Sequence, residues 1–321
     1  RPNFMKSAPI IRAIEDLREN KEFLDFRLVH TGQHYDAKLS ATFFDQLGIP
    51  KPDVDLEVGS ASHAQQTAEI MRRFEPIVDN EKPDAVLVVG DVNSTIACAL
   101  VAAKKQISVV HVEAGLRSYD RAMPEEINRV LTDQLSDLLF TTERKALDNL
   151  VKEGVDSNKV HFVGNVMIDT LRANLSQSVP PEQTISKSDN PENFLKNPSG
   201  YGVLTLHRPS NVDDPEVLHD LLQTLSDISK DLPLIFPIHP RTKSAINKAG
   251  LDHLLDTPNI LQLSPLGYLE MLGLMARAKL VLTDSGGLQE ETTALGVPCI
   301  TLRTNTERPI TAEQGTNTVV G

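Results

Sequence analysis

The sequence predicts an α/β protein built from two Rossmann-like, doubly wound domains. Short, apolar, β-rich runs alternate with helical patterns along the whole chain, and this order is typical of parallel sheets covered by helices on both faces. The 321 residues are enough for about two domains at roughly 150 residues each. The apolar fraction of 40% and the charged fraction of 24% are ordinary globular values, so disordered and fibrous classes are excluded.

The first half of the chain has the pattern of one parallel sheet. Strands are expected at residues 26–31, 85–89, 108–112, 138–141 and 160–163. Helical periodicity separates most of them, as at residues 94–105 and 125–135. The chain opens on an amphipathic helical pattern at residues 10–14, with no strand and no initiator Met before it. We therefore expect the chain to be incomplete at this end.

The second half repeats this order. Strands are expected at residues 203–206, 234–238, 260–263, 280–283 and 299–302, with helices at 215–228 and 268–277 among them. Residues 176–199 are rich in Pro, Ser and Asn and lack a sustained period, which indicates a loop or connector. We place the domain boundary just before it, so that residues 1–164 form the N-terminal domain and residues 165–321 the C-terminal domain.

Charge and cysteine content exclude several function classes. A net charge of -12 opposes the basic surface that nucleic acids and anionic membranes require. Cys98 and Cys299 are far apart in sequence, so neither a disulfide framework nor a zinc cluster is expected, and a cytoplasmic setting fits best. No apolar run approaches the roughly 18 residues of a membrane span. Phosphate-binding loops, dinucleotide fingerprints and nucleophile elbows are missing, which disfavours triphosphate hydrolysis, NAD binding and hydrolase chemistry.

Carboxylates follow the strands of the first domain. Asp91 and Glu113 come directly after two expected strands, and Glu125 opens the helix that follows. Ligands of open α/β sheets bind at the carboxyl ends of the strands, and clustered acids can separate into acid and base roles. Structural explanations are also available, because Asp91 can cap a helix and Glu125 can be a first-turn acid. Glu113 is harder to explain in that way, since it follows an apolar strand.

The second domain ends its strands in groups suited to an anion. Ser285, Gly286 and Gly287 precede a helix whose N-terminus attracts phosphate, although a simple helix cap explains them equally well. His207 and His239 each end a strand and can donate to phosphate or transfer a proton. A metal site is less favoured, because neither His has a second ligand two to four residues away. Two sheet edges are thus expected to face one central cleft.

Taken together, these segments resemble the non-hydrolysing UDP-N-acetylglucosamine 2-epimerase family, whose two-domain fold is that of the GT-B glycosyltransferases. Each motif alone is weak, but all of them in order are highly specific. They are Arg1-Pro2 with Lys6, Thr31-Gly32-Gln33-His34, Gly90-Asp91-Val92-Asn93-Ser94-Thr95, His111-Val112-Glu113-Ala114-Gly115-Leu116-Arg117, Pro124-Glu125-Glu126-Ile127-Asn128-Arg129, His207-Arg208, residues 283–291 and Thr306-Glu307-Arg308-Pro309. Family members extend beyond both ends of this chain, so we expect it to be incomplete at both.

The resemblance implies roles for individual residues. The catalytic groups would be Asp91, Glu113, Glu125 and His207. The groups that bind a UDP-sugar would be Arg1, Lys6, Arg129, Leu266, Met271, Ser285, Gly286, Gly287, Glu291 and Arg308. Among these, the diphosphate would lie against Arg1, His207 and the start of the helix after Ser285. The ribose would lie on Glu291 and the uracil near Leu266 and Met271.

The chemistry implied is reversible epimerisation at C2 of UDP-N-acetylglucosamine, by anti-elimination of UDP to a glycal and its return. It needs no redox cofactor and no metal. The resemblance also implies a cytoplasmic homodimer that serves cell-surface polysaccharide biosynthesis. The alternatives are a 2-epimerase for a UDP-diacetamido-uronic acid, with Arg117 or Arg121 for the extra carboxylate, a hydrolysing 2-epimerase, a GT-B glycosyltransferase, and a non-catalytic nucleotide-sugar sensor.

Overall fold

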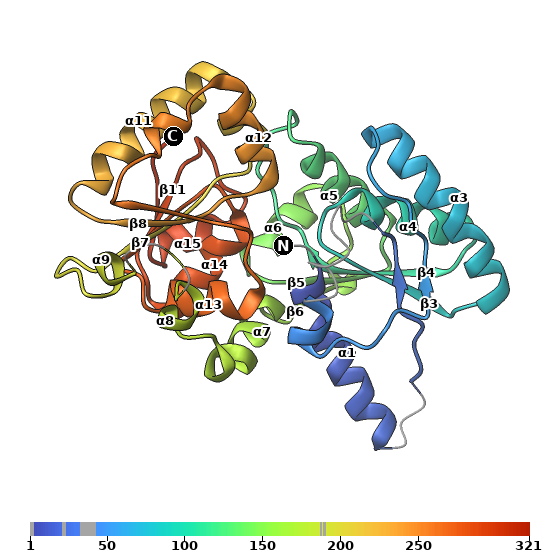
Figure 1. Cartoon of the computed structure of the whole chain (residues 1–321). Helices are drawn as coiled ribbons and strands as arrows, with labels where there is room; N and C mark the ends of the chain where they lie inside the picture. The colour runs from blue at the N-terminus through green and yellow to red at the C-terminus, as the bar shows by residue number, and fades with distance from the viewer. Residues whose placement is uncertain (1–2, 21–23, 33–42, 187, 189–190) are drawn as a thin grey trace. The chain divides into compact units, whose positions relative to one another are not determined.

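The computed structural model describes residues 3–20, 24–32, 43–186, 188 and 191–321 (Figure 1). The chain divides into two compact units, residues 1–170 (unit 1) and residues 171–321 (unit 2). Sequence patterns put the boundary between residues 164 and 165, whereas this division falls inside helix α7 (Val166–Asn174). Each unit is an α/β body with a parallel sheet, as the sequence predicts.

The main sheet of unit 1 has four parallel strands in the order β3-β4-β5-β6. They are β3 (Ala85–Val89), β4 (Ser108–Ala114), β5 (Leu138–Thr141) and β6 (Val160–Phe162), which confirms four of the expected strands. The strand expected at residues 26–31 is much shorter. Only β1 (Val29–His30) forms, and it pairs with β2 (Val54–Asp55), which the sequence pattern did not reveal because a two-residue strand has no detectable period.

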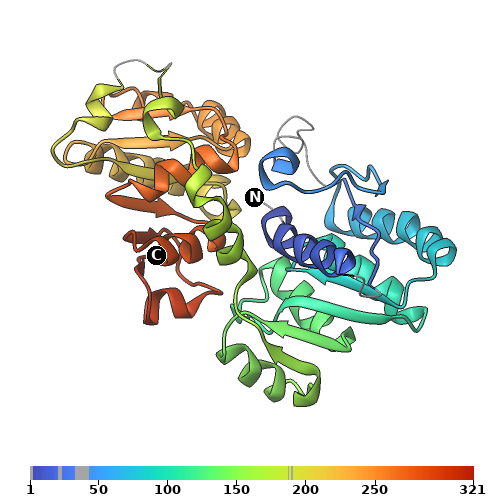
Figure 2. The ribbon, with the colours of Figure 1, turned by 90° about the horizontal axis from the view of Figure 1, so that it is seen from below.

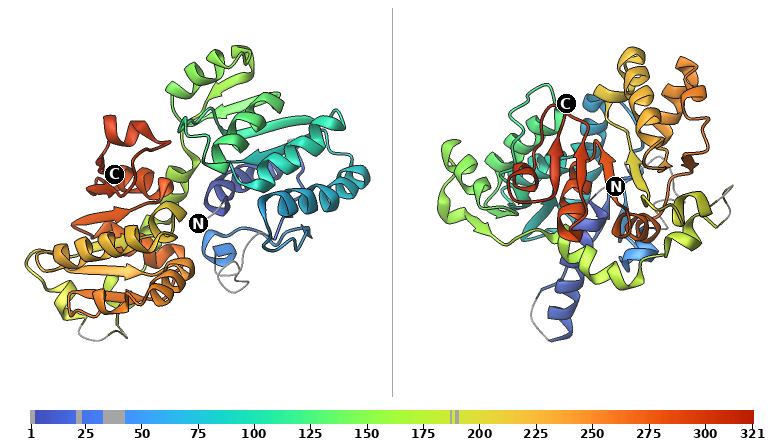
Figure 3. Two further views of the ribbon diagram at one scale, coloured as in Figure 1. Left: turned by 90° about the horizontal axis from the view of Figure 1, so that it is seen from above. Right: turned by 90° about the vertical axis from the view of Figure 1, so that its left-hand side faces the viewer.

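Helices cover both faces of this sheet. Helices α3 (His63–Glu81), α4 (Asn93–Lys104) and α5 (Pro124–Leu135) lie side by side over one face (Figure 3, left). Helix α1 (Phe4–Glu19) lies on the opposite side (Figure 2). Three fully buried alanines of α4, Ala97, Ala99 and Ala102, have no side chain beyond Cβ, so this helix packs closely on the sheet and on α3. The remaining elements are α6 (Lys145–Lys152) and the 3-10 turn η1 (Ser157–Lys159).

The strands of unit 2 form one parallel sheet in the order β12-β11-β10-β7-β8-β9 (Figure 3, right). The strands are β7 (Gly202–Thr205), β8 (Leu234–Pro237), β9 (Ile260–Leu263), β10 (Leu280–Thr283), β11 (Cys299–Thr301) and β12 (Asn317–Val319). The chain builds outward from β7 and then returns to place β10 on its other side. Ligands of doubly wound sheets bind at such a switch point, here at the carboxyl ends of β7 and β10.

Two hydrophobic cores lie on opposite faces of this sheet. Leu204 packs into the core under α11 (Pro215–Ser229) and α12 (Pro240–Ala249), whereas its neighbour Val203 packs into the core under α13 (Tyr268–Ala276) and α14 (Gly286–Leu295) (Figure 1). Successive side chains of a strand point to opposite faces, so one strand serves both cores. Shorter elements are α10 (Pro209–Val212), α15 (Pro309–Glu313) and η3 (Asp252–Leu254).

The described parts of residues 176–199 contain more regular structure than the composition of this segment indicates. Composition predicts a loop or connector, and the loop interpretation is wrong for three short elements, η2 (Leu175–Gln177), α8 (Pro181–Thr184) and α9 (Glu192–Leu195). Pro181 opens α8, a position where its missing N–H costs nothing. The segment also packs on α13, where the Val179 N–H donates to the Leu269 carbonyl at 3.0 Å. The Val179 carbonyl lies so close to Gly273 that a Cβ at position 273 would overlap it.

The described part of the chain contains no helix with the length and apolar character of a membrane span. Cys98 and Cys299 are both buried free thiols, and burial raises the pKa of Cys98 to about 12. Among the same described residues, no group of three or more His, Cys, Asp or Glu side chains is placed to hold a metal ion.

Candidate active site

Glu113 occupies a strained position at the end of β4. The pairing of β4 with β5 shifts register between Val112 and Ala114, and Glu113 has a φ of 75°. A non-glycine residue in the left-handed region costs free energy, and bulges re-aim side chains beside active sites. The Glu113 residue is only 5% exposed, and its carboxylate pairs with the Lys6 ammonium of α1. The structure thus holds a charged group in a place that folding alone does not favour.

Asp91 follows β3 after a left-handed Gly90, and helix α5 holds it from two sides. Arg129 Nη1 lies 2.5 Å from Asp91 Oδ2, and the Asn128 amide donates to the Asp91 backbone carbonyl at 2.9 Å. The Asp91 side chain remains 24% exposed, whereas that of Arg129 is 2% exposed. The buried guanidinium therefore fixes a carboxylate that solvent, and hence a small molecule, can reach.

Glu125 and Glu126 occupy the first turn of α5 after Pro124. Glu125 is half-buried and lies four residues before Arg129, so both are on one side of the helix. Glu126 is buried and accepts from the backbone N–H groups of Ser118 and Tyr119 at 3.0 and 2.9 Å, and it pairs with Arg129 at 2.9 Å. Sequence reasoning missed this anchoring role of Glu126, because adjacent acids look alike until the helix is placed.

The switch point of unit 2 is held by Asp284, which follows β10. Asp284 Oδ2 accepts from the backbone N–H groups of His207 and Arg208 at 2.9 and 2.8 Å, and Oδ1 lies 2.9 Å from His207 Nδ1. Burial raises the pKa of the Asp284 carboxyl, but the hydrogen bond and charge of His207 and the two N–H groups hold it below its usual value. An ionised carboxylate therefore orients the His207 ring, a role that sequence reasoning did not assign.

Arginines surround the start of α14. Ser285 is its N-cap, but its side chain makes no capping hydrogen bond. A Cβ at Gly286 would overlap Glu307 Oε1, so a carboxylate already lies against this helix start. Burial raises the pKa of Glu307, while Arg303, Arg308 and Arg208 lower it to about 2. In general, a helix N-terminus and guanidinium groups are suited to bind phosphate oxygens, and in this structure the arginines face Glu307.

A family model described as UDP-N-acetylglucosamine 2-epimerase matches residues 15–321. The chain belongs to this family. It is 45% identical to the UDP-N-acetylglucosamine 2-epimerase of Methanocaldococcus jannaschii, over all of this chain and 86% of that protein. It is 41% identical, over the same shares, to the UDP-2,3-diacetamido-2,3-dideoxy-D-glucuronate 2-epimerase of Pseudomonas aeruginosa.

The fold is that of the same epimerase family. The crystal structure of the M. jannaschii UDP-GlcNAc 2-epimerase in complex with UDP-GlcNAc and UDP matches with a TM-score of 0.86 and 43% identity. The match covers 99% of this chain and 86% of that one. The two Rossmann-like units are therefore GT-B-like. The prediction that their strand ends face a common cleft stays a prediction.

The other residues expected from the epimerase family fall in different settings. Glu291 is fully buried in α14, and Arg308 Nε lies 2.9 Å from Glu290 Oε1. Leu266 is half-buried. The Met271 side chain belongs to the hydrophobic core, so a uracil ring expected here could contact only the backbone of Met271. Arg1 and the Gln33-His34 pair lie outside the described residues.

His239 lies beside His207 and is the N-cap of α12. Its Nδ1 accepts from the Arg241 N–H at 3.2 Å, and its ring centroid is 5.7 Å from that of His207. His239 is exposed, but partial desolvation and the neighbouring His207 lower its pKa to about 4. The Arg241 N–H already shows that Nδ1 carries no proton, because this nitrogen accepts a hydrogen bond. His239 is therefore neutral at neutral pH and is a hydrogen-bonding group there, not a second cation.

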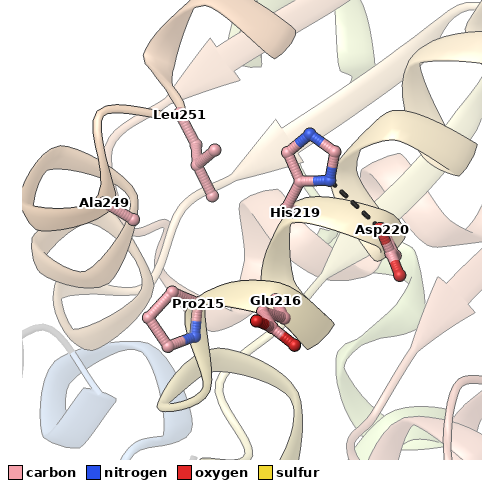
Figure 4. A pocket seen from close by; sticks show the side chains of 6 residues that line it. All are labelled: Pro215, Glu216, His219, Asp220, Ala249 and Leu251. Atoms are coloured by element: carbon pink, nitrogen blue, oxygen red, sulfur yellow. Dashed lines mark hydrogen bonds and ion pairs between the residues drawn. The ribbon is translucent and has the colours of Figure 1, made fainter.

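A hollow of about 380 Å³ lies between the start of α11 and the end of α12 in unit 2 (Figure 4). Its lining residues are Pro215, Glu216, His219, Asp220, Ala249 and Leu251. The His219 ring lies 3.0 Å from Asp220 Oδ1, and both side chains are on the surface. None of the residues expected from the epimerase family lines this hollow, so it does not compete with the strand ends as the active site.

Proposed function

We propose that this protein interconverts UDP-N-acetylglucosamine and UDP-N-acetylmannosamine without hydrolysing them. The single observation that carries the proposal is Glu113, a buried carboxylate at a bulge with φ 75°, paired with Lys6. Strain of this kind persists where a side chain must be aimed for chemistry. Membership of the UDP-N-acetylglucosamine 2-epimerase family supports proton transfer at C2 as that chemistry.

The proposed reaction is an elimination followed by the reverse addition. A carboxylate takes the proton from C2 of the sugar, the C2–H electron pair forms a C1=C2 double bond, and the C1–O bond breaks with its electrons leaving on UDP. The glycal then receives a proton at C2 from its opposite face while a UDP oxygen bonds again to C1. Proton, electron pair and leaving group are all returned, so no external oxidant or reductant is needed.

We assign the proton transfers to the acids of unit 1. One of Asp91, Glu113 and Glu125 removes the C2 proton, and another serves the opposite face. A C–H group beside an oxygen-bearing carbon is weakly acidic, so the base must be ionised and correctly placed. Ion pairs of Glu113 with Lys6 and of Asp91 with Arg129 support the ionised form of both acids.

We assign the leaving diphosphate to unit 2. The start of α14, His207 and Arg308 are the proposed groups that stabilise its developing charge, together with Arg1. Donors aimed in advance at such a charge lower the barrier without reorganisation. The fixed orientation of His207 on Asp284 supports this role, because the ring cannot turn without losing a buried partner.

A second candidate is 2-epimerisation of a UDP-diacetamido-uronic acid, favoured by the relative from P. aeruginosa. This substrate adds a carboxylate that needs a cation. Arg117, one of two candidates from sequence, is buried and already paired with Asp133 at 2.7 Å and with Glu153 at 2.8 Å. Arg121 is exposed and is the remaining candidate for that role.

Proton NMR in deuterium oxide tests the proposal. The protein is incubated with UDP-N-acetylglucosamine, and deuterium at C2 and all sugar products are followed with time. An equilibrium with UDP-N-acetylmannosamine that carries deuterium at C2 is the expected result. Free N-acetylmannosamine with UDP would select hydrolysis instead. If no deuterium is exchanged, the assay is repeated with the UDP-diacetamido-uronic acid. Exchange at C2 of that substrate would support the second candidate.

A further inference from the structure

His111 is a completely buried histidine on β4 with a hydrogen-bond acceptor on each side of its ring. Its Nε2 lies 2.9 Å from the Gly90 carbonyl oxygen, and its Nδ1 lies 2.6 Å from Asp133 Oδ1. A carbonyl oxygen can only accept a hydrogen bond, so Nε2 carries a proton. The state of the ring then depends on Asp133.

Asp133 is ionised because its surroundings donate to it from three sides. Its Oδ2 accepts from the Gly115 N–H at 3.1 Å and lies 2.7 Å from Arg117 Nη2, while its Oδ1 faces His111. Burial raises the pKa of the Asp133 carboxyl, but His111 and Arg117 hold it below its usual value. An ionised carboxylate has no proton to give, so His111 Nδ1 must donate as well. With both nitrogens protonated, His111 is an imidazolium.

The charges around His111 agree with this state. Burial lowers the pKa of His111, but Asp133 on α5, the Gly90 carbonyl and Glu113 on its own strand raise it above its usual value. The cations nearby are already matched, since Arg117 also pairs with Glu153 and Lys6 pairs with Glu113. The same Coulomb attraction acts in return on Glu113, so a cation at His111 favours the ionised form of that acid.

This ion pair ties together the two turns that carry the acids. His111 holds the carbonyl of Gly90, the residue before Asp91, and the Gly90 N–H donates to the Val112 carbonyl at 3.0 Å. Asp133 holds the N–H of Gly115, two residues after Glu113. Both glycines have positive φ values, 71° and 78°, so each turn has a defined shape that the bonds fix.

We propose that His111, held as an imidazolium between Asp133 and Gly90, is a positioning residue that sets Asp91 and Glu113 at the spacing the reaction requires. The inference rests on the proposed function for the identity of the reaction. Misplacing a reacting group by about 1 Å can lower the rate about 10²-fold. Loss of the hydrogen bonds from His111 to Gly90 and Asp133 is therefore expected to lower kcat.

The first test is a spectroscopic titration of the protein labelled with ¹⁵N-histidine. The expected result is that both His111 nitrogens keep imidazolium shifts at pH 7.5, above the ordinary histidine pKa of about 6.5. The signal of His219, a surface residue, is the reference. His111→Gln and His219→Gln assign the two signals by their disappearance. One unprotonated His111 nitrogen at pH 7.5 would overturn the imidazolium. This test needs no turnover, so it stands even if the proposed epimerase reaction is not found.

The second test separates positioning from folding. His111→Ala is expected to lower kcat by about 10-fold to 100-fold per folded molecule, with KM and UDP affinity within twofold of the unmodified protein. His111→Gln keeps an N–H toward Gly90 and is expected to recover part of kcat, and surface variant His219→Gln is the control with normal kcat. Unchanged kcat in His111→Ala, or a rise in KM alone, would overturn the proposal. If His111→Ala fails to fold, the same comparison is made between His111→Gln and His219→Gln.

Discussion

The Lys6 ammonium and the Glu113 carboxylate form an ion pair that joins the first turn of α1 to the end of β4. Both side chains are largely withdrawn from water, with exposed fractions of 13% and 5%. Each charge therefore depends on the other for its compensation. Substitutions at Glu113 consequently report on chemistry, charge and backbone strain, and the choice of replacement separates these effects.

Glu113→Gln and Asp91→Asn test the acid–base assignment. Each replacement keeps the shape of the side chain and removes its basicity, so C2 deuterium exchange is expected to slow by about 10²–10⁴-fold. Asp220→Asn, in the hollow of unit 2, is the control for a surface carboxylate. The assignment fails if both active-site variants are folded and exchange at nearly the normal rate.

Glu113→Gly and Glu113→Ala isolate the backbone strain. Both remove the carboxylate and leave Lys6 equally uncompensated, so they differ only in the Cβ. Because φ at position 113 is 75°, the Gly variant is expected to be more stable than the Ala variant by about 1 kcal/mol. This order is opposite to that of a helix interior, where Ala is the more stable. Urea unfolding of the pair measures the difference, and equal or reversed stabilities would show that the left-handed backbone is not strained.

Asp284→Asn tests the carboxylate that orients His207. The pKa of Asp284 is lowered in the folded state, so its contribution to the free energy of unfolding is present above its unfolded value near 3.8 and is lost as pH falls through the folded pKa. The His207 side chain is 34% exposed, so its charge is not left buried. We therefore expect the variant to be less stable by about 1–3 kcal/mol at pH 7, the cost of weakening the hydrogen bonds of a buried acceptor. The difference in free energy of unfolding between the unmodified protein and the variant should decrease below about pH 4. Denaturant unfolding at pH 3 to 7 measures it, and a gap independent of pH would contradict the ionised state.

Ser285→Ala and Asp214→Ala compare two helix N-caps. The Asp214 side chain accepts from the Glu216 and Val217 N–H groups, whereas the Ser285 side chain makes no such bond. Asp214→Ala should therefore cost about 1 kcal/mol of stability and leave UDP affinity unchanged. Ser285→Ala should cost less stability and weaken UDP binding measured by calorimetry. Normal UDP affinity in Ser285→Ala would remove this hydroxyl from the proposed phosphate site.

Sequence patterns predict the sheets of both units and bring the right residue types to the strand ends. Glu113 could be found because it follows an apolar run, but its bulge and positive φ arise from the packing of β4 against β5 and have no local signal. The pairing of His111 with Asp133 was also hidden, because 22 residues separate them and only the placement of α5 brings them together. Arg129 was expected near the sugar, and its contact with Asp91 required the same placement.

The segment at residues 176–199 has a practical consequence for protein engineering. Its composition is that of a region where insertions, affinity tags or a protease cut are tolerated. The contacts of this segment predict that such changes are not tolerated. Ile185 and Phe194 are buried in the core of unit 2, and the Val179 carbonyl fills the space beside Gly273 of α13. Opening the chain here would pull two anchors out of unit 2. A circular permutant or a reporter fusion is better joined elsewhere, and limited proteolysis should leave the α8 region uncut while the protein is folded.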